Sequence, residues 1–191
     1  MKNIKGSESE KNLLKAFAGE SQARNRYTFF SSVARNEGFE QISAIFLETA
    51  DNEKEHAKVF FKYLEGGDVL IEASYPAGKI GTTSENLLVA ANGERLEWGK
   101  IYPAFERVAR NEGFRKIADS FKQIAEVEEQ HEKRYRRLLE NLKTHKVFKK
   151  DRVVKWRCRN CGYVHIGKSA PEKCPACSHP RAFYELLGEN Y

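Results

Sequence analysis

The residues best suited to chemistry are two Glu-x-x-His motifs, Glu53–His56 and Glu128–His131, which stand 75 positions apart. Residues at i and i+3 share a helix face, so each motif can offer a carboxylate oxygen and an imidazole nitrogen to one site. A four-helix bundle builds a two-metal carboxylate site from two such motifs and one Glu from each remaining helix. The spacing therefore predicts a pair of metal ions inside a helical core.

The segments around the motifs repeat with the same offset. Residues 33–39 and 108–114 both read VARNEGF, and Tyr27 corresponds to Tyr102. An internal repeat of this kind indicates a duplicated structural unit, here a helical hairpin whose first helix stops at Glu-Gly. We therefore expect an all-α four-helix bundle.

Start and stop signals set the expected limits of the helices, and the first is expected to open at Ser7 or Ser9. The expected helices span about residues 9–36, 40–64, 84–111 and 115–144. Residues 66–83 lack helical periodicity and suit a long crossover between the second and third helices. The helical period fades near residue 148, so we expect a bundle over residues 1–147 and a small β/loop metal module over 148–191.

Carboxylates interrupt the apolar stripe of each expected helix at matching depth. They are Glu20, Glu53, Glu94 and Glu128. Several ionised carboxylates in a dry core are tolerable only around a cation, and oxygen-rich ligation with one imidazole per metal suits iron or manganese better than zinc. A lone Glu-x-x-His is usually a solvated face, but two in register favour metal. Glu55, Glu126 and Glu129 lie off the stripe and are interpreted as surface charges.

The two halves differ by one residue in the third helix. Glu20 precedes Tyr27 by seven positions, whereas Glu94 precedes Tyr102 by eight. A helix can absorb one extra residue as a π-bulge, a feature often found at functional sites. Glu97 then becomes a seventh ligand that makes the two metals inequivalent, or an exposed acid beside Trp98.

Tyr27 and Tyr102 have two interpretations. They can hydrogen-bond the ligand carboxylates, or they are amphipathic core residues. With Glu97 and His56, they are our candidates for catalytic roles.

All four cysteines form one C-x2-C-x12-C-x2-C pattern. They are Cys158, Cys161, Cys174 and Cys177. Each C-x-x-C turn lets backbone N–H groups point at the sulfurs, and two facing turns make a tetrahedral thiolate site. Zinc and a single iron fit four thiolates equally well. A zinc ribbon would be structural or bind nucleic acid, and an iron site would carry one electron.

Charge is concentrated at the junction of the two expected units. Residues 133–159 hold twelve Lys or Arg and two acids, a local charge of +10, whereas the whole 191-residue chain carries +6. Such a patch can steer an acidic partner or bind nucleic acid, or it is a solvated helix end. No signal peptide and no apolar run long enough to span a membrane are visible, so we expect a cytoplasmic protein whose cysteines bind metal rather than form disulfides.

The duplicated Glu and Glu-x-x-His bundle, followed by CRNCGY and CPAC, resembles the rubrerythrin family over essentially the whole chain. The first part is similar to the ferritin-like di-iron bundle and the last part to a shortened rubredoxin. One departure is Ser178, which stands where the second cysteine turn of the family has glycine.

The resemblance implies a non-haem di-iron peroxidase of oxidative-stress defence, which reduces hydrogen peroxide to water as a diferrous pair becomes diferric. Electrons would return through the Fe(Cys)4 site from a soluble donor, rubredoxin or an NAD(P)H-dependent reductase. Glu20 and Glu94 would be terminal ligands, Glu53 and Glu128 bridging ligands, and His131 a nitrogen ligand. The other iron would exchange Glu97 for His56 on reduction.

The distance between the centres favours a dimer. About ten helical residues follow His131, or ~15 Å of helix, so a head-to-tail homodimer would shorten the electron transfer, as the resemblance also implies. Rival interpretations are a ferroxidase or iron store, a zinc-ribbon nucleic-acid binder, and an enzyme that consumes oxygen or superoxide.

Overall fold

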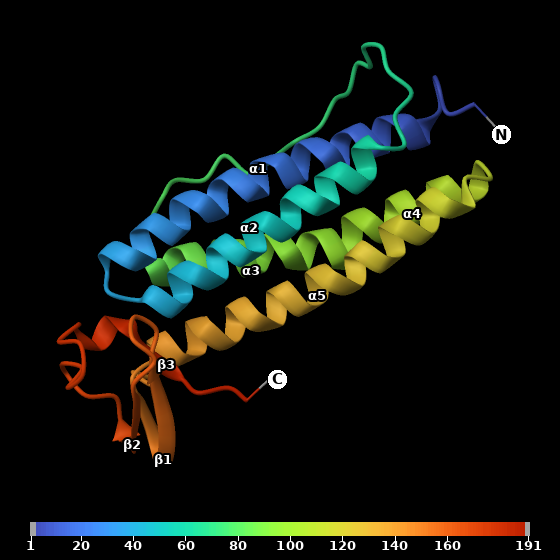
Figure 1. Cartoon of the computed structure of the whole chain (residues 1–191). Helices are drawn as coiled ribbons and strands as arrows, with labels where there is room; N and C mark the ends of the chain where they lie inside the picture. Colours follow the sequence, from blue (N-terminus) through green and yellow to red (C-terminus); the bar gives the residue numbers. More distant parts are fainter. Residues whose placement is uncertain (1–2, 190–191) are drawn as a thin grey trace.

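The computed structural model describes residues 3–189 and has a long helical bundle with a small β module at one end (Figure 1). The helices of the bundle are α1 (Glu8–Asn36), α2 (Glu40–Phe61), α3 (Thr83–Leu96), α4 (Tyr102–Asn111) and α5 (Arg115–Lys143). A π-helical turn, η1 (Glu97–Ile101), joins α3 to α4. The expected four-helix bundle is confirmed, with α3, η1 and α4 together forming its third helix.

Local sequence explains where the helices begin and end. The Ser7 hydroxyl accepts a hydrogen bond from the Glu10 N–H and caps α1. Thr82 and Glu85 form a capping box at α3, so this helix begins before the expected Ser84. The second helix ends at Phe61 rather than near residue 64, because the chain tightens into i→i+3 bonds before Gly66 and Gly67.

The two VARNEGF turns have the same backbone geometry. Gly38 and Gly113 both have φ of 84°, a conformation in which glycine costs little. The N–H of Phe39 donates to Ala34 O at 2.8 Å, and that of Phe114 donates to Ala109 O at 2.8 Å. The sequence repeat is therefore a structural repeat.

Each turn also caps the other hairpin. The Glu37 carboxylate accepts the N–H of Thr83 at 3.1 Å, at the start of α3. The Glu112 carboxylate accepts the N–H groups of Glu8 and Ser9, at 3.1 and 2.9 Å, at the start of α1. Carboxylates are favourable at helix N-termini because free N–H groups and the helix dipole face them. These reciprocal caps hold the hairpins in register.

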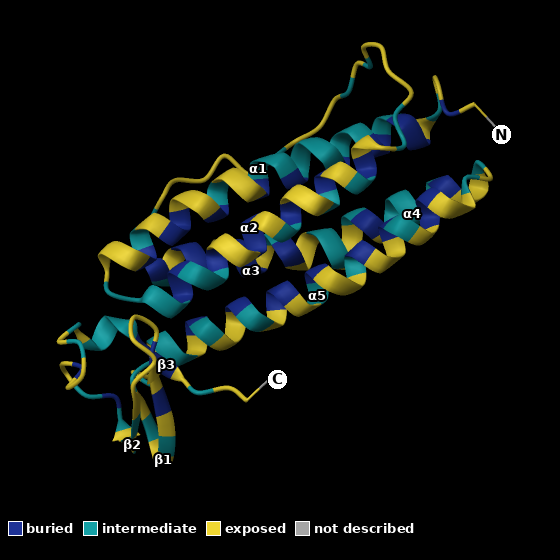
Figure 2. Cartoon of the chain, viewed as in Figure 1, coloured by how far each residue is buried: buried dark blue, intermediate teal, exposed yellow. Residues whose placement is uncertain are grey.

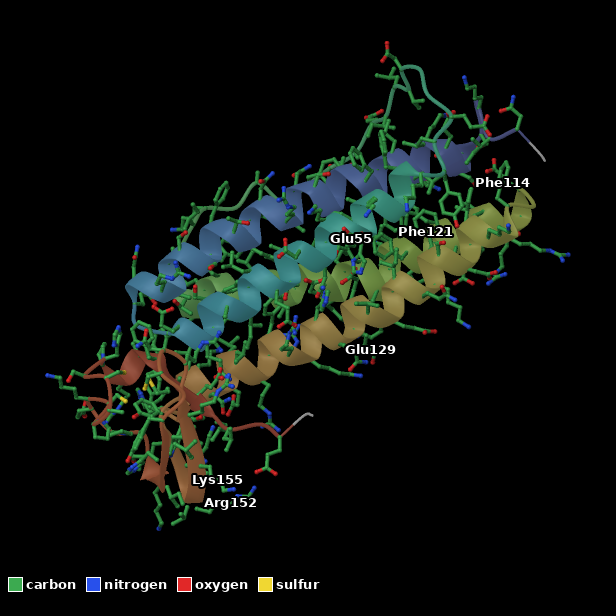
Figure 3. The ribbon with its side chains drawn as sticks, in the orientation of Figure 1. Glu55, Phe114, Phe121, Glu129, Arg152 and Lys155 are labelled. Atoms are coloured by element: carbon green, nitrogen blue, oxygen red, sulfur yellow. The ribbon has the colours of Figure 1, made fainter. Side chains whose placement is uncertain are left out.

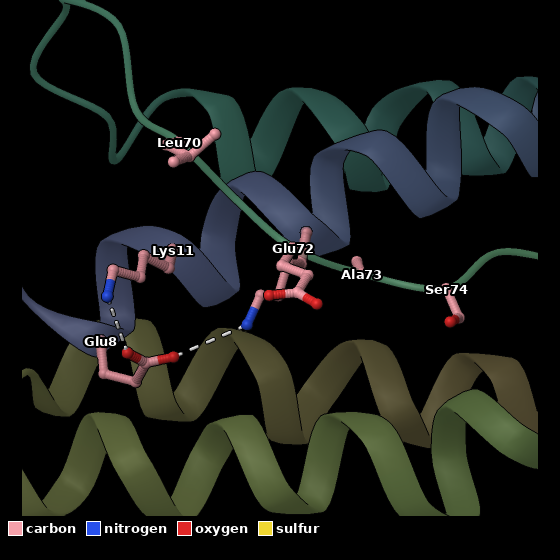
Figure 4. A pocket seen from close by; sticks show the side chains of 7 residues that line it. Glu8, Lys11, Leu70, Glu72, Ala73 and Ser74 are labelled. Carbon is pink, nitrogen blue, oxygen red and sulfur yellow. Dashed lines mark hydrogen bonds and ion pairs between the residues drawn. The ribbon is translucent and has the colours of Figure 1, made fainter.

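The crossover between α2 and α3 runs along the outer side of α1, from one end of the bundle to the other (Figure 1). Near the start of α1, Leu70, Glu72 and Ala73 lie beside Lys11 (Figure 4). Further along, the Tyr75 hydroxyl donates to Lys15 O at 2.8 Å. The crossover is thus tied to α1 and covers it.

The core of the bundle consists of two apolar clusters. One contains Phe30, Phe46 and Tyr135, and the other contains Phe60 and Phe121, whose ring centroids lie 4.9 Å apart. Buried residues follow the inner faces of the helices (Figure 2), and the equally buried carboxylates of the predicted metal site separate the apolar ones among them. The predicted apolar stripes are therefore the buried faces.

The C-terminal module is an antiparallel sheet in the order β2-β1-β3. Its elements are β1 (Lys149–Cys158), β2 (Val164–Ser169), a 3-10 turn η2 (Arg181–Phe183) and β3 (Tyr184–Leu186). Trp156 and Tyr184 fill its small core. The rings of Phe39 and Phe148 stack at 6.1 Å and join the module to the turn between α1 and α2.

Within residues 3–189, no helix combines the length and the apolar character needed to cross a bilayer.

Candidate metal centres

Four carboxylates and two histidines meet inside the bundle. They form two overlapping groups, and in each group the ligand atoms lie within 4.8 Å of one another. The first group is Glu20, Glu53, His56 and Glu128, and the second is Glu53, Glu94, Glu128 and His131. Glu53 and Glu128 belong to both groups, so the arrangement has two metal positions with two shared carboxylates. All six residues predicted from the repeat are thus brought together.

The ligand atoms lack hydrogen bonds that would satisfy them. Both oxygens of Glu128 and one oxygen each of Glu20, Glu53 and Glu94 are buried without a hydrogen-bond partner. The Nδ1 atoms of His56 and His131 lie 2.7 Å from Glu128 oxygens, but these contacts leave the oxygens unsatisfied. Unsatisfied buried carboxylates are costly, so the residues fit cations placed between them.

Electrostatics gives the same result. Burial, followed by the neighbouring carboxylates, raises the pKa of Glu20 and Glu94 well above the usual range. Burial would lower the pKa of His56, but its close contacts with the carboxylates of Glu128 and Glu53 raise it to about 10. In the same way the pKa of His131 is raised to about 9. The same two histidines lower the pKa of the shared Glu128 to about 2, against the effect of its burial. Metal ions bound here would supply positive charge to these carboxylates in place of protons.

Two tyrosines brace the cluster in a crossed pattern. The Tyr27 hydroxyl on α1 donates to Glu94 Oε1 on α3 at 2.5 Å. The Tyr102 hydroxyl on α4 donates to Glu20 Oε1 on α1. Both rings are almost fully buried, so these residues are at once core residues and partners of the candidate ligands.

The extra residue of the third helix forms the predicted π-bulge. Glu97 is the first residue of η1, is half-buried, and lies outside both groups of ligand atoms. Burial, followed by the charges of Glu128 and Glu53, raises its pKa to about 8. Glu97 is therefore not an exposed acid, and it borders a cluster in which His56 is already included.

Beside Glu97 lies a network that the sequence did not indicate. The Trp98 Nε1–H donates to Glu132 at 2.6 Å, and Arg136 donates to the same carboxylate at 2.6 Å. Glu132 is only 8% exposed and follows the candidate ligand His131. From sequence alone, an acid beside a Glu-x-x-His motif is interpreted as a surface charge. Glu132 is buried because Trp98, which lies on η1, packs against it and donates a hydrogen bond to it.

Glu55, Glu126 and Glu129 are surface residues, as predicted. Glu55 pairs with Lys58 at 2.9 Å and Glu129 with Lys133 at 2.8 Å. Both lie on the outer sides of their helices, away from the candidate ligands (Figure 3).

The four cysteines converge in the C-terminal module. Cys158 Sγ lies 3.8 Å from Cys177 Sγ, and Cys161 Sγ lies 3.7 Å from Cys174 Sγ. A tetrahedron with metal–sulfur bonds of about 2.3 Å has sulfur–sulfur edges of about 3.8 Å. The thiols are free, and their spacing fits one metal ion held by four thiolates.

The two cysteine turns have matching shapes. The N–H of Gly162 donates to Cys158 O, and the N–H of Ser178 donates to Cys174 O, both at 2.9 Å. Gly162 has φ of 81° and Ser178 has φ of 61°, so Ser178 adopts the left-handed conformation that glycine would adopt easily. A backbone N–H bond from His179 lowers the pKa of Cys177 to about 6. The departure at Ser178 therefore leaves the ligand geometry intact.

The fold and both sites define a class of protein: a ferritin-like bundle with a carboxylate and histidine di-iron site, fused to a rubredoxin-like four-cysteine module. The family description "Rubrerythrin" matches residues 11–139, and "Rubrerythrin, rubredoxin-like domain" matches residues 156–185. The chain belongs to the rubrerythrin family.

Curated relatives align along the full chain. A rubrerythrin of Porphyromonas gingivalis is 58% identical over 190 residues, covering 100% of this chain and 95% of the relative. A rubrerythrin of Nitratidesulfovibrio vulgaris is 57% identical over 191 residues and covers 100% of both chains. The predicted family resemblance is confirmed.

Solved structures agree with the fold. A structure titled as a mixed-valence state of nigerythrin superposes with a TM-score of 0.63 at 32% identity, covering 97% of this chain and 89% of that chain. A reduced symerythrin of Cyanophora paradoxa has a TM-score of 0.63 at 24% identity, covering 74% and 89%, and shows the shared fold alone.

Proposed function

We propose that the protein is a peroxidase that reduces hydrogen peroxide to water with electrons relayed through the four-cysteine site. The observation that carries this proposal is the buried cluster with two shared carboxylates, in which five carboxylate oxygens of Glu20, Glu53, Glu94 and Glu128 have no hydrogen-bond partner. A pair of irons bound there would supply two electrons together, as reduction of the O–O bond requires. An iron at the cysteine site would return them singly, which zinc cannot do.

Within this proposal each residue has a role. Glu20 and Glu94 would hold one metal each, and Glu53 and Glu128, which belong to both groups of ligand atoms, would be shared by the two. His131 would bind one metal through nitrogen. The crossed hydrogen bonds of Tyr27 and Tyr102 fix the terminal carboxylates in orientation.

His56 and Glu97 would hold the second metal in different oxidation states. His56 belongs to the ligand group and Glu97 does not, and the charge of Glu128 raises the pKa of both side chains. Glu97 is also the carboxyl group placed to carry a proton between solvent and the cluster, because it is half-buried at the edge of the bundle. Hydrogen peroxide needs two protons to leave as two water molecules.

The electron path favours a head-to-tail homodimer. From His131 to the end of α5 at Lys143 there are twelve residues, which is about 18 Å of helix, and the cysteine module lies beyond that end (Figure 1). A second chain running in the opposite direction would bring its cysteine site near this bundle site.

The donor is a soluble protein with an acidic face, either a rubredoxin or an NAD(P)H-dependent reductase. The middle of β1 carries Arg152 and Lys155 on the module's surface (Figure 3), where Lys155 pairs with Glu189 at 3.4 Å. Arg157 and Arg159 are paired with Glu185, so we place the docking surface around the exposed Arg152 of β1.

The remaining assignments rest on the same features. We place the domain boundary between residues 147 and 148, because α5 ends at Lys143 and β1 begins at Lys149; the outer limits, residues 1 and 191, lie outside the described residues. Four free thiols arranged for metal suit a reducing compartment, so we assign the protein to the cytoplasm.

The first experiment combines metal analysis with a peroxide assay. The iron-loaded protein should contain about three irons per chain, show an iron-thiolate optical spectrum, and oxidise two donor equivalents per peroxide without releasing oxygen. A mineral of many irons per chain would favour a store, and a colourless zinc protein would overturn the proposal.

The dimer has its own test. Two inactive variants, Cys158→Ser and Glu128→Ala, are mixed after unfolding and refolding together. A head-to-tail dimer regains activity, because one chain supplies the intact cysteine site and the other the intact bundle site. No gain over the separate variants would contradict transfer between chains.

A further inference from the structure

A cavity of about 310 Å³ lies between α1, the π-helical turn and the crossover. Glu97 and Tyr102 stand in its wall. Tyr102 is almost fully buried and donates its hydroxyl hydrogen to Glu20, so the inner end of the cavity borders the metal cluster. The outer side is covered by residues 73–76 of the crossover.

The cavity is hollow because the elements around it present small side chains. These are Ala16, Gly19, Ala73, Gly93 and Ala104. A Cβ atom added at Gly93 would meet no atom within 4 Å. Leu96, Ile101 and Phe105 supply most of the remaining apolar wall. The space beside the cluster is therefore mainly apolar.

The size of the cavity exceeds what hydrogen peroxide needs. A water molecule occupies about 30 Å³ in the liquid, so a two-oxygen molecule fills only a small part of 310 Å³. Pockets that bind small organic molecules begin at about 300 Å³ and are mainly apolar with a few polar groups. The few charged groups in the wall of this cavity are Glu97, Lys15, Arg26 and Lys100.

The crossover segment over the cavity, residues 73–76, packs against α1. The Tyr75 hydroxyl donates to Lys15 O at 2.8 Å, and its ring lies 3.8 Å from the place where a Cβ of Gly19 would be. A larger hollow of about 690 Å³ at the start of α1 differs, because its lining is mainly polar and includes Glu8, Lys11 and Glu72 (Figure 4). It includes none of the candidate metal ligands.

We propose that the 310 Å³ cavity binds the alkyl or aryl group of an organic hydroperoxide, ROOH, with the hydroperoxide group turned toward Glu97, and that the protein reduces it. This inference rests on the proposed peroxidase function, which supplies the electrons. The O–O bond breaks, and two electrons from the reduced metal pair and two protons give ROH and water. The soluble donor then restores the two electrons.

The kinetic test compares two peroxides and two matched variants of the iron-loaded full chain. Ala104→Leu fills the cavity, whereas Ala44→Leu places the same side chain at a half-buried position of α2 that does not line it. We expect Ala104→Leu to lower kcat/KM for cumene hydroperoxide, relative to hydrogen peroxide, by about tenfold or more. Ala44→Leu should leave this ratio as in the wild type.

A binding test does not depend on turnover. Calorimetric titration of the iron-loaded full chain with 2-phenylpropan-2-ol, the alcohol product, should show binding for the wild type and Ala44→Leu and none for Ala104→Leu. If Ala104→Leu does not fold, Gly93→Leu fills the same space, with iron content as its check.

The outcomes separate the two proposals. Reduction of hydrogen peroxide but not of cumene hydroperoxide overturns the inference and leaves the peroxidase function standing. Reduction of neither peroxide overturns the peroxidase function, and with it the reduction of ROOH. Equal behaviour of the two leucine variants in both tests overturns the assignment of the cavity.

Discussion

The two hairpins of the bundle are one unit built twice, yet they differ where the chemistry is. Their turns share the same φ at Gly38 and Gly113 and the same hydrogen-bond lengths. Their tyrosines are exchanged symmetrically, each bonding a carboxylate of the other hairpin. The difference is one residue, which the second hairpin absorbs as η1.

This difference shows that a π-helical turn can accommodate an inserted residue without shifting the rest of the helix. Glu94 and Tyr102 remain aligned with Glu20 and Tyr27 because the extra residue is absorbed between them. The turn is one residue longer than the matching part of α1, where Ala23 or Arg24 stands at the place of Glu97. A symmetric ligand set thereby gains one asymmetric acid without disturbing the rest of the core.

The strongest test of the symmetry is the loss of a shared carboxylate. Glu53→Ala and Glu128→Ala should each reduce iron from about three to about one per chain, because both metal positions depend on the missing residue. Peroxide reduction should disappear in both. Iron analysis after desalting measures this, with Glu55→Ala as the control on the surface of the same helix. Loss of only one iron would argue against bridging.

Deletion of Gly99 should make the second hairpin resemble the first. The spacing from Glu94 to Tyr102 becomes seven, so η1 can close into a regular α-helix. We expect two irons in the bundle and peroxide turnover lowered by about 10²-fold, since Glu97 is displaced. Glu97→Gln in the intact turn should give a comparable loss. Full turnover after the deletion would mean that the asymmetry has no role in the reaction.

Removal of the crossed hydroxyls sharpens the comparison. Tyr27→Phe and Tyr102→Phe each release one terminal carboxylate, Glu94 or Glu20, from its hydrogen bond. Each should lower iron affinity or peroxide turnover by about 10- to 100-fold, and by similar amounts. In the double variant, the two losses should add if the two hydrogen bonds act independently and should not add if they act together. A large effect at only one tyrosine would show that the two metal positions are functionally unequal.

The smallest effects are expected at the reciprocal caps. Glu37→Ala removes an acceptor from one N–H group of α3, and the free energy of unfolding should fall by about 1 kcal/mol. Glu112→Ala should cost more, because Glu112 accepts two N–H groups and the Ser9 hydroxyl. Thermal unfolding monitored by circular dichroism measures both, with Glu126→Ala as an exposed control. The reverse order would contradict the cap assignment.

Sequence reasoning predicted the parts that periodicity and repetition encode. The bundle, the π-bulge and the six clustered residues were predicted from a 75-residue offset and a helical period, because both patterns are visible in the sequence itself. The limits of α2 and α3 were wrong by a few residues, since caps and turns compete there. The burial of Glu132 beneath Trp98 and the cavity under residues 73–76 were not predictable, because they depend on packing between distant segments.

Glu37 and Glu112 each cap the first helix of the opposite hairpin. The contacts that hold the two hairpins together therefore do not depend on the covalent link between them. A chain cleaved at Gly66-Gly67 should therefore reassemble from two polypeptides. By the same logic, a single ancestral hairpin that paired with its own copy would already have had a carboxylate at the start of its first helix, and gene fusion would have added the crossover afterwards.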